Sequence, residues 1–137
     1  MKAFNDLIKP VRAISPVSVS DNTAQVSQII DTLGFHGLEF LIATGSIADA
    51  DATFAVTIQE SDDSGMSGAT DVASTNLDGT LAAAGFQYDD DNETRKIGIK
   101  ELTKRYVQLT ITPSGNASAA LLSCIALLHS PRKAPTT

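Results

Sequence analysis

Tryptophan is absent from the sequence, and aromatic residues of all kinds make up only 5% of its 137 residues. A core built from this composition must be mostly aliphatic. No segment approaches the roughly 20 consecutive apolar residues that a membrane-spanning helix needs, because the most apolar stretch, 117–128, is interrupted by Ser118 and Ser123. We therefore expect no membrane partner.

Cysteine occurs once, at Cys124, within the apolar stretch AALLSCIALLH. A single cysteine cannot close a disulfide within the chain, and its apolar neighbours predict a buried thiol that packs as a small hydrophobic side chain. A catalytic thiol would need a base, and the only histidines are His36 and His129. We interpret Cys124 as a core residue.

Basic residues are too few and too scattered for a nucleic-acid partner. The formal net charge is −6 and the isoelectric point is about 4.6. Lys and Arg cluster only as dipeptides at 95–96, 104–105 and 132–133, whereas phosphate neutralisation needs a continuous basic surface. The N-terminal MKAFNDLIKPVRAISP lacks the continuous apolar segment of a signal peptide, so we expect synthesis in the cytoplasm.

What the sequence does contain is short alternating segments. In KRYVQLTITPSGN (104–116), Val107, Leu109 and Ile111 alternate with polar residues, a pattern typical of a strand with one buried face. Turn-forming residues separate similar segments at intervals of about ten residues. The expected strands are 17–19, 25–32, 37–46, 53–61, 72–77, 94–101, 105–112 and 118–128.

This spacing predicts an all-β protein, an antiparallel β-sandwich with a jelly-roll-like arrangement of about eight strands. We expect strands 37–46 and 53–61 to form an antiparallel pair joined by a short loop. The nearly all-apolar segment 118–128 should be central or buried on both faces. The predicted organisation is an N-terminal arm over 1–16, a sandwich domain over 17–129 and a C-terminal tail over 130–137, with both ends extended.

No motif in the chain indicates catalysis. Acidic residues gather in predicted loops, as Asp49, Asp51, Asp62, Asp63 and the run 89–91, but none has EF-hand spacing. We interpret them as solvated turn residues, with calcium binding as the alternative. A sugar cleft of paired carboxylates would need aromatic walls, and no G-x-S-x-G, phosphate-binding or dinucleotide-binding pattern occurs. We predict no enzyme activity, no cofactor and no metal.

Two features do suggest a partner. The N-terminal arm and the C-terminal segment SPRKAPTT are basic within an acidic chain, and extended basic ends often dock on a neighbouring subunit. The alternative is that they are frayed termini. The predicted partner-binding residues are Phe4, Leu7, Ile8, Val11, Arg12, Arg132 and Lys133.

Two longer segments carry a family resemblance. The stretch ADATFAVTIQESDDSGMSGATDV, followed by GIKELTKRYVQLTITPSGNASAALLSCIALLHSPRKAP, resembles a family of small virion proteins of tailed bacteriophages. The similarity covers about residues 40–135. It consists of a strand with an acidic loop, the K-R-Y-V-Q-L strand with T-P-S-G after it, and a closing P-R.

The resemblance implies a capsid decoration or cement protein with a jelly-roll-like fold, forming a homotrimer on the outer surface of the head. Its partners would be the major capsid protein and further copies of itself. No catalytic residue is carried over from the family. Two alternatives stay open, a head–tail connector or tail component, and a carbohydrate-binding or receptor-binding module, against which the low aromatic content counts.

Overall fold

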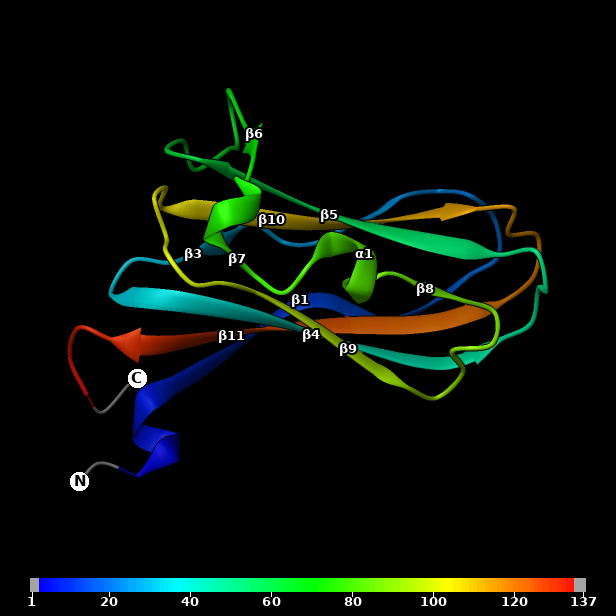
Figure 1. The fold of residues 1–137 in the computed structure, drawn as a ribbon, viewed down its shortest axis with the longest axis horizontal. Helices are drawn as coiled ribbons and strands as arrows, with labels where there is room; N and C mark the ends of the chain where they lie inside the picture. The colour runs from blue at the N-terminus through cyan, green and yellow to red at the C-terminus, as the bar shows by residue number, and fades with distance from the viewer. Residues whose placement is uncertain (1–2, 135–137) are drawn as a thin grey trace.

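The computed structural model describes residues 3–134, which form two antiparallel sheets packed face to face (Figure 1). In spatial order, the first sheet contains β1 (Ile8–Val19), β11 (Ala120–Pro131), β4 (Phe35–Ile47), β9 (Thr94–Ile99) and β7 (Leu77–Asp78). The second contains β2 (Gln25–Val26), β10 (Tyr106–Ser114), β5 (Thr53–Ser61) and β6 (Thr70–Asp71), with β3 (Ile30–Asp31) on β10 and β8 (Phe86–Gln87) on β5. Three short helical turns complete the fold: η1 (Phe4–Leu7), η2 (Ser74–Asn76) and α1 (Leu81–Ala84).

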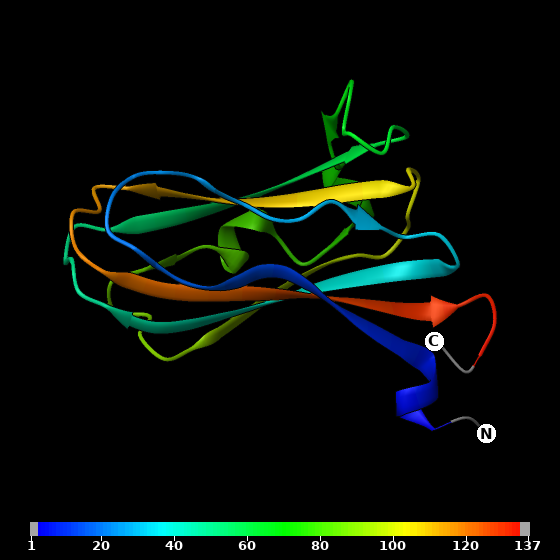
Figure 2. The ribbon, with the colours of Figure 1, turned by 180° about the vertical axis from the view of Figure 1, so that it is seen from behind.

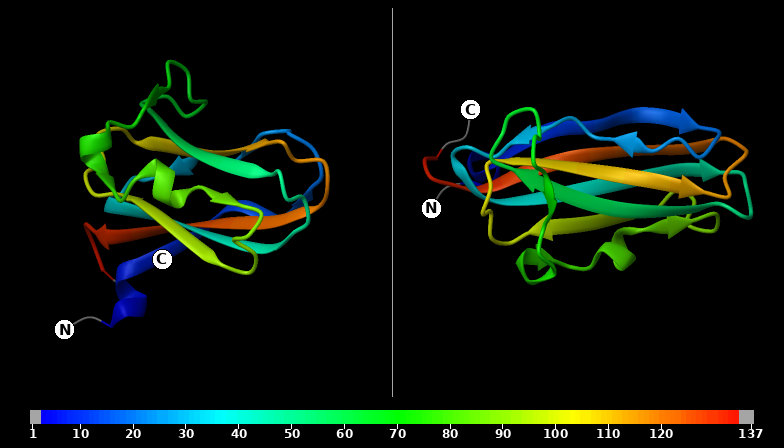
Figure 3. Two further views of the ribbon diagram at one scale, coloured as in Figure 1. Left: turned by 45° about the vertical axis from the view of Figure 1, so that its right-hand side comes forward. Right: turned by 90° about the horizontal axis from the view of Figure 1, so that it is seen from above.

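The chain crosses repeatedly between the two sheets, as Figures 2 and 3 show. From β1 it passes to β2 and β3 in the second sheet, returns to β4, crosses to β5, and later alternates again through β9, β10 and β11. Taking β2 with β3, and β6 with β8, as interrupted strands, and setting aside the two-residue β7 at the edge of the first sheet, leaves eight positions. Their orders in the two sheets are 1-8-3-6 and 2-7-4-5. This is a jelly-roll arrangement, and the expected antiparallel sandwich is confirmed.

The alternating sequence explains where the core lies. In β5, Phe54, Val56 and Ile58 are buried while the residues between them are exposed. Leu109 of β10 lies directly opposite Ile58 and is fully buried. Leu38, Phe40 and Ile42 of β4 face them from the first sheet. Burying each such side chain stabilises the fold by about 1.5–3 kcal/mol.

The expected pairing of segments 37–46 and 53–61 is wrong. β4 pairs with β11 and β9, and β5 pairs with β10. The loop between β4 and β5 carries the chain from one sheet to the other, so the two strands bury their apolar faces against each other. Alternation predicts a buried face equally well for either arrangement, so the sequence pattern did not distinguish them.

The N-terminal arm expected over 1–16 is wrong for most of its length. Residues 8–19 form β1, the edge strand of the first sheet, in antiparallel register with β11 from Ile8 opposite His129 to Val19 opposite Ala120. Pro10 and Pro16 lie within this strand, which an edge position tolerates. At the other end β11 runs to Pro131 and so takes in the start of the expected tail, whose residues 135–137 lie outside the described part.

The last strand is central, as expected, but it is not buried on both faces. β11 lies between β1 and β4, and alternate residues along it are buried. On the opposite face Leu121 is 44% exposed and Ile125 is 47% exposed. The outer face of the first sheet therefore presents aliphatic side chains to solvent.

Candidate functional site

The chain termini and one turn meet at a single end of the sandwich, on the left in Figure 1 and the right in Figure 2. Because Ile8 lies opposite His129, η1 extends beyond the end of the β1–β11 pair. The backbone N–H of Arg132 donates to the carbonyl oxygen of Gly34 at 2.8 Å, which holds the segment after β11 against the turn before β4. We define the terminal end as Phe4, Leu7, Leu33, Arg132 and Lys133.

Two apolar side chains at the terminal end are unusually open to solvent. Phe4 is 69% exposed and Leu33 is 61% exposed, the two largest values among the large hydrophobic residues that the structure describes. Sequence reasoning selected Phe4 but missed Leu33. The available signal was a leucine at a turn, between Thr32 and Gly34, where the fold has no need of an apolar residue.

The terminal end is locally basic although the chain is acidic. Lys9, Arg132 and Lys133 are exposed there. The nearby carboxylate of Asp31 is neutralised by Arg105, whose Nε and Nη2 donate to its two oxygens at 2.8 and 2.9 Å. These hydrogen bonds hold the pKa of Asp31 below its ordinary value. Apolar anchors beside exposed cations that form no salt bridge within residues 3–134 can bind an apolar surface that has an acidic border.

The other predicted partner-binding residues have roles within the fold. Ile8 is half-buried, and Val11 packs against the core. The Nε of Arg12 donates at 2.8 Å to the side-chain oxygen of Gln28, with that amide oriented so that its oxygen faces the guanidinium. The structure thus gathers Phe4, Leu7 and the two C-terminal cations, and assigns the middle of the expected arm to the sandwich.

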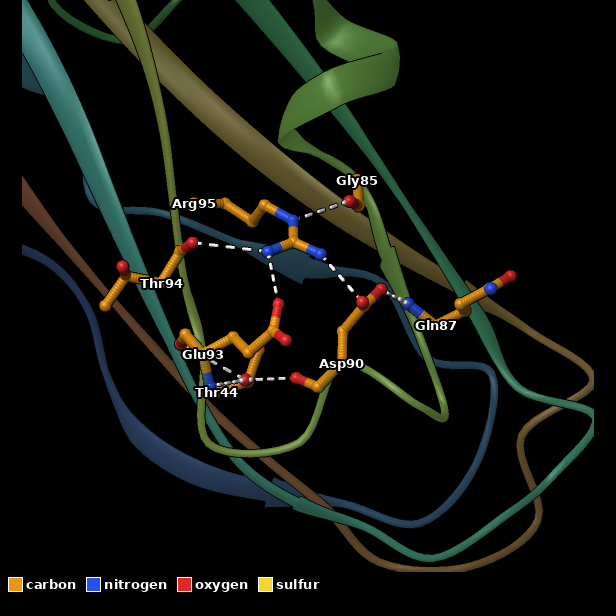
Figure 4. A network of polar contacts seen from close by, with 7 residues as sticks. All are labelled: Thr44, Gly85, Gln87, Asp90, Glu93, Thr94 and Arg95. Atoms are coloured by element: carbon orange, nitrogen blue, oxygen red, sulfur yellow. Dashed lines mark hydrogen bonds and ion pairs between the residues drawn. The ribbon is translucent and has the colours of Figure 1, made fainter.

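The acidic run 89–91 is tied into the fold by a polar network, shown in Figure 4. The guanidinium of Arg95 contacts Asp90 at 2.8 Å and Glu93 at 2.7 Å. Asp90 also accepts from the backbone N–H of Gln87 at 2.8 Å, and the hydroxyl of Thr44 donates to the Asp90 carbonyl at 2.7 Å. Arg95 therefore ties the loop between β8 and β9 together, and hydrogen bonds with the Thr44 hydroxyl hold this loop against β4.

The remaining acidic loops use their carboxylates in the same way. Asp49 accepts from the backbone N–H groups of Asp51 and Ala117, and Asp63 accepts from those of Gly65 and Ser67. These are turn-stabilising bonds, as the interpretation of turn residues expected. Within residues 3–134, no group of three or more His, Cys, Asp or Glu side chains is placed to hold a metal ion.

The groups considered for catalysis are not arranged as a site. Cys124 is 1% exposed, and burial raises the pKa of its thiol to about 12, so it stays protonated at neutral pH. The register places His129 opposite Gly37, one residue from His36, and by strand alternation the two histidine side chains point to opposite faces. A groove of about 560 Å³ beside β5 is lined by Phe54, Phe86 and other residues, and its one carboxylate, Asp90, is held by Arg95.

Helices play almost no part in the fold. The described residues contain no helix that is long and apolar enough to cross a bilayer.

Comparison with known proteins identifies the fold. No protein-family model matches the chain, and no curated protein matches it significantly. Among solved structures it is similar to the PBSX exported protein XepA, with a TM-score of 0.60 and 14% identity over 97% of this chain. A protein of the disulfide-linked pili that form Bacillus endospore appendages gives a TM-score of 0.47 and 11% identity, covering 91% of this chain and 89% of that one.

The chain spans 40% of the length of XepA. At 14% identity this similarity shows a shared sandwich fold and does not by itself transfer an activity.

Proposed function

We propose that the protein is a structural component of a bacteriophage virion, and more specifically a head decoration protein that binds the outer capsid surface and stabilises the shell. The observation that carries the proposal is the terminal end, where exposed Phe4 and Leu33 lie with Arg132 and Lys133 at one tip of an acidic sandwich. The sequence resemblance to small phage virion proteins supports it. So does the fold shared with the phage-derived exported protein XepA.

The arrangement suits attachment to a shell. The acidic, polar body would stand in solvent, and the terminal end would contact the major capsid protein without contacting nucleic acid or membrane. A protein that binds the assembled shell, and not its free subunits, stabilises the shell by mass action. Many copies on a repeating lattice make modest individual contacts sufficient.

The test combines copy number with targeted substitution. We would count copies per virion against the major capsid protein, then add purified protein to heads that lack it. The double variant Phe4→Ser with Leu33→Ser should lose at least ten-fold in binding while keeping its thermal transition. Val26→Ser is the matched control, because Val26 is 56% exposed but lies in β2 of the second sheet.

Each outcome assigns the protein differently. Hundreds of copies per particle, with loss of binding only in the terminal-end variant, would support head decoration. A ring of about six or 12 subunits at low copy number would favour the head–tail connector alternative. Absence from virions would contradict both and favour a receptor-binding or carbohydrate-binding module.

A further inference from the structure

The two outer faces of the sandwich differ in chemistry. The outer face of the second sheet carries hydroxyl and amide side chains along β5 and β10: Thr53, Thr57, Gln59, Gln108, Thr110 and Thr112. The outer face of the first sheet carries Leu41, Leu121 and Ile125, each between 39% and 47% exposed, together with half-buried Leu127. A sheet face that meets water is normally polar, so the first sheet has the composition of a face that is covered.

The outer face of the first sheet is also flattened by glycines. A side chain at Gly98 would collide with the carboxylate of Glu39, and one at Gly37 would collide with the ring of His129. A Cβ at Gly45 would lie 2.9 Å from the Cβ of Leu121. Glycine within a strand costs stability, and here it lets neighbouring side chains lie flat across the sheet.

Charges on this face lie in two neighbouring rows of opposite sign. Lys96 lies level with Leu41 and Ile125 across β9, β4 and β11. Two residues along, about 6.6 Å away, the next row holds Glu39 with its carboxylate over Gly98, and Asp78 beyond it on β7.

Neither Lys96 nor Glu39 forms a salt bridge within residues 3–134. Burial and the charge of Asp78 raise the pKa of Glu39, and Lys96 only partly opposes them. A further cation beside the Glu39 carboxylate would therefore stabilise its charged form.

We propose that this face binds the same face of a second copy, about a two-fold axis that runs across the strands between the two charged rows. This axis places Lys96 of each copy over the carboxylate of Glu39 of the other. It places Ile125 over Leu127 of the second copy. A two-fold interface brings one patch against itself, and the two rows of opposite sign make this patch self-complementary.

The position of the axis allows the whole face to overlap. It crosses β11 at its middle, with Leu121, Ser123 and Ile125 on one side and Leu127, His129 and Pro131 on the other. The three long strands β1, β11 and β4 have 12, 12 and 13 residues. At about 3.3 Å per residue and 4.8 Å between strands, they and β9 cover roughly 650 Å² on each copy. The total of about 1,300 Å² is within the range of stable interfaces.

A dimer of this kind differs from the homotrimer that the family resemblance implies, which stays a prediction. In a three-fold ring each face meets a different surface of its neighbour. Lys96 of one copy would then not contact Glu39 of another. The dimer concerns the purified protein alone. If the purified protein does not dimerise, the proposed head attachment through the terminal end is unaffected. Likewise, a failure of head attachment would not contradict the dimer.

Sedimentation equilibrium of the full chain at neutral pH and low salt tests the proposal. We expect a mass of two chains, and Ile125→Lys should give monomers with an unchanged thermal transition. Val26→Lys is the control, since Val26 is more exposed than Ile125 but lies on the second sheet, and it should stay dimeric.

Charge reversal tests the two-fold pairing itself. Lys96→Glu alone and Glu39→Lys alone should each weaken dimerisation about ten-fold, because like charges then meet twice in each dimer. An equimolar mixture of the two variants should restore it, since both pairs in the mixed dimer are again opposite in charge. A monomer or trimer for the unaltered chain would overturn the proposal, as would a mixture that associates no better than the single variants.

Discussion

Ile8 of the first strand lies directly opposite His129 of the last strand, so the start of β1 and the end of β11 lie side by side at the same end of the first sheet. From this pair the register runs inward to Ile14 opposite Cys124, where both side chains are buried. The N-terminal segment therefore divides at about residue 8 into a projecting turn and a structural strand.

Truncations on either side of this boundary should behave differently. Deleting residues 1–7 removes η1, which has no buried residue among its described positions, and should change the free energy of unfolding by less than about 1 kcal/mol. Deleting 1–14 also removes Val11, Ala13 and Ile14 from the core, and should cost about 3 kcal/mol or more. Urea denaturation of both proteins measures the difference. Equal stability would show that β1 does not contribute to the fold.

A charge at the centre of β10 should abolish folding. Leu109 is fully buried opposite Ile58, so Leu109→Asp places a carboxylate in the core at a cost above about 4 kcal/mol. Thr112→Asp on the solvent side of the same strand is the control and should fold. Soluble expression and circular dichroism report the outcome. A folded Leu109→Asp protein would show that the buried face of β10 is shifted by one residue.

Removing the central cation of the loop network should destabilise the sandwich measurably. Arg95 joins Asp90 and Glu93 and is largely shielded from solvent, so Arg95→Gln should lower the free energy of unfolding by about 1–2 kcal/mol. Lys104 forms a single exposed pair with Asp62, and Lys104→Gln should change it by less than about 0.5 kcal/mol. Similar losses in both variants would mean that the network adds nothing beyond a surface pair.

The pair of Asp31 and Arg105 should make stability depend on pH in the acid range. The pKa of Asp31 is lower in the folded protein than its ordinary value of 3.8. Its contribution is therefore fully present above that value and is lost as the pH falls through the folded pKa. Asp31→Asn should lower Tm by a few degrees at pH 7, and this difference should shrink as the pH falls below 3.8. A constant difference across that range would contradict the assignment.

Cys124 should be unreactive in the folded protein. Its thiol is buried and its pKa is raised to about 12, so a thiol reagent at pH 8 should label it only as fast as the protein opens. Labelling in water and in denaturing urea, followed by mass spectrometry, gives the comparison. Rapid labelling under native conditions would mean that the first sheet opens locally at β11.

Some features of the fold were predictable because they depend on local pattern. The alternation in 53–61 predicted β5 with the bounds that the structure has, and 105–112 predicted most of β10. The helical turn α1 was not predicted. It is only four residues long and begins with Thr80 accepting from the N–H of Ala83, a signal too short to stand out from a polar loop.

The candidate site was only partly predictable. Phe4, Leu7, Arg132 and Lys133 were selected as members of extended ends, while Val11 and Arg12 were included with them and proved to belong to the sandwich. Leu33 was missed because nothing in its neighbourhood of the chain relates it to the termini. It joins them only through the contact of Arg132 with Gly34.

By itself the sequence determined that this is an aliphatic, all-β protein, where β4, β5, β9, β10 and β11 lie, and which side of most of them is buried, because each depends on neighbours within a few residues. The tertiary structure alone decided which strands pair. β1 joins β11 across more than 100 residues of chain, and β4 separates from β5 despite their closeness in sequence. Pairing of this kind depends on how two apolar faces cover each other, and that cannot be read from either strand alone.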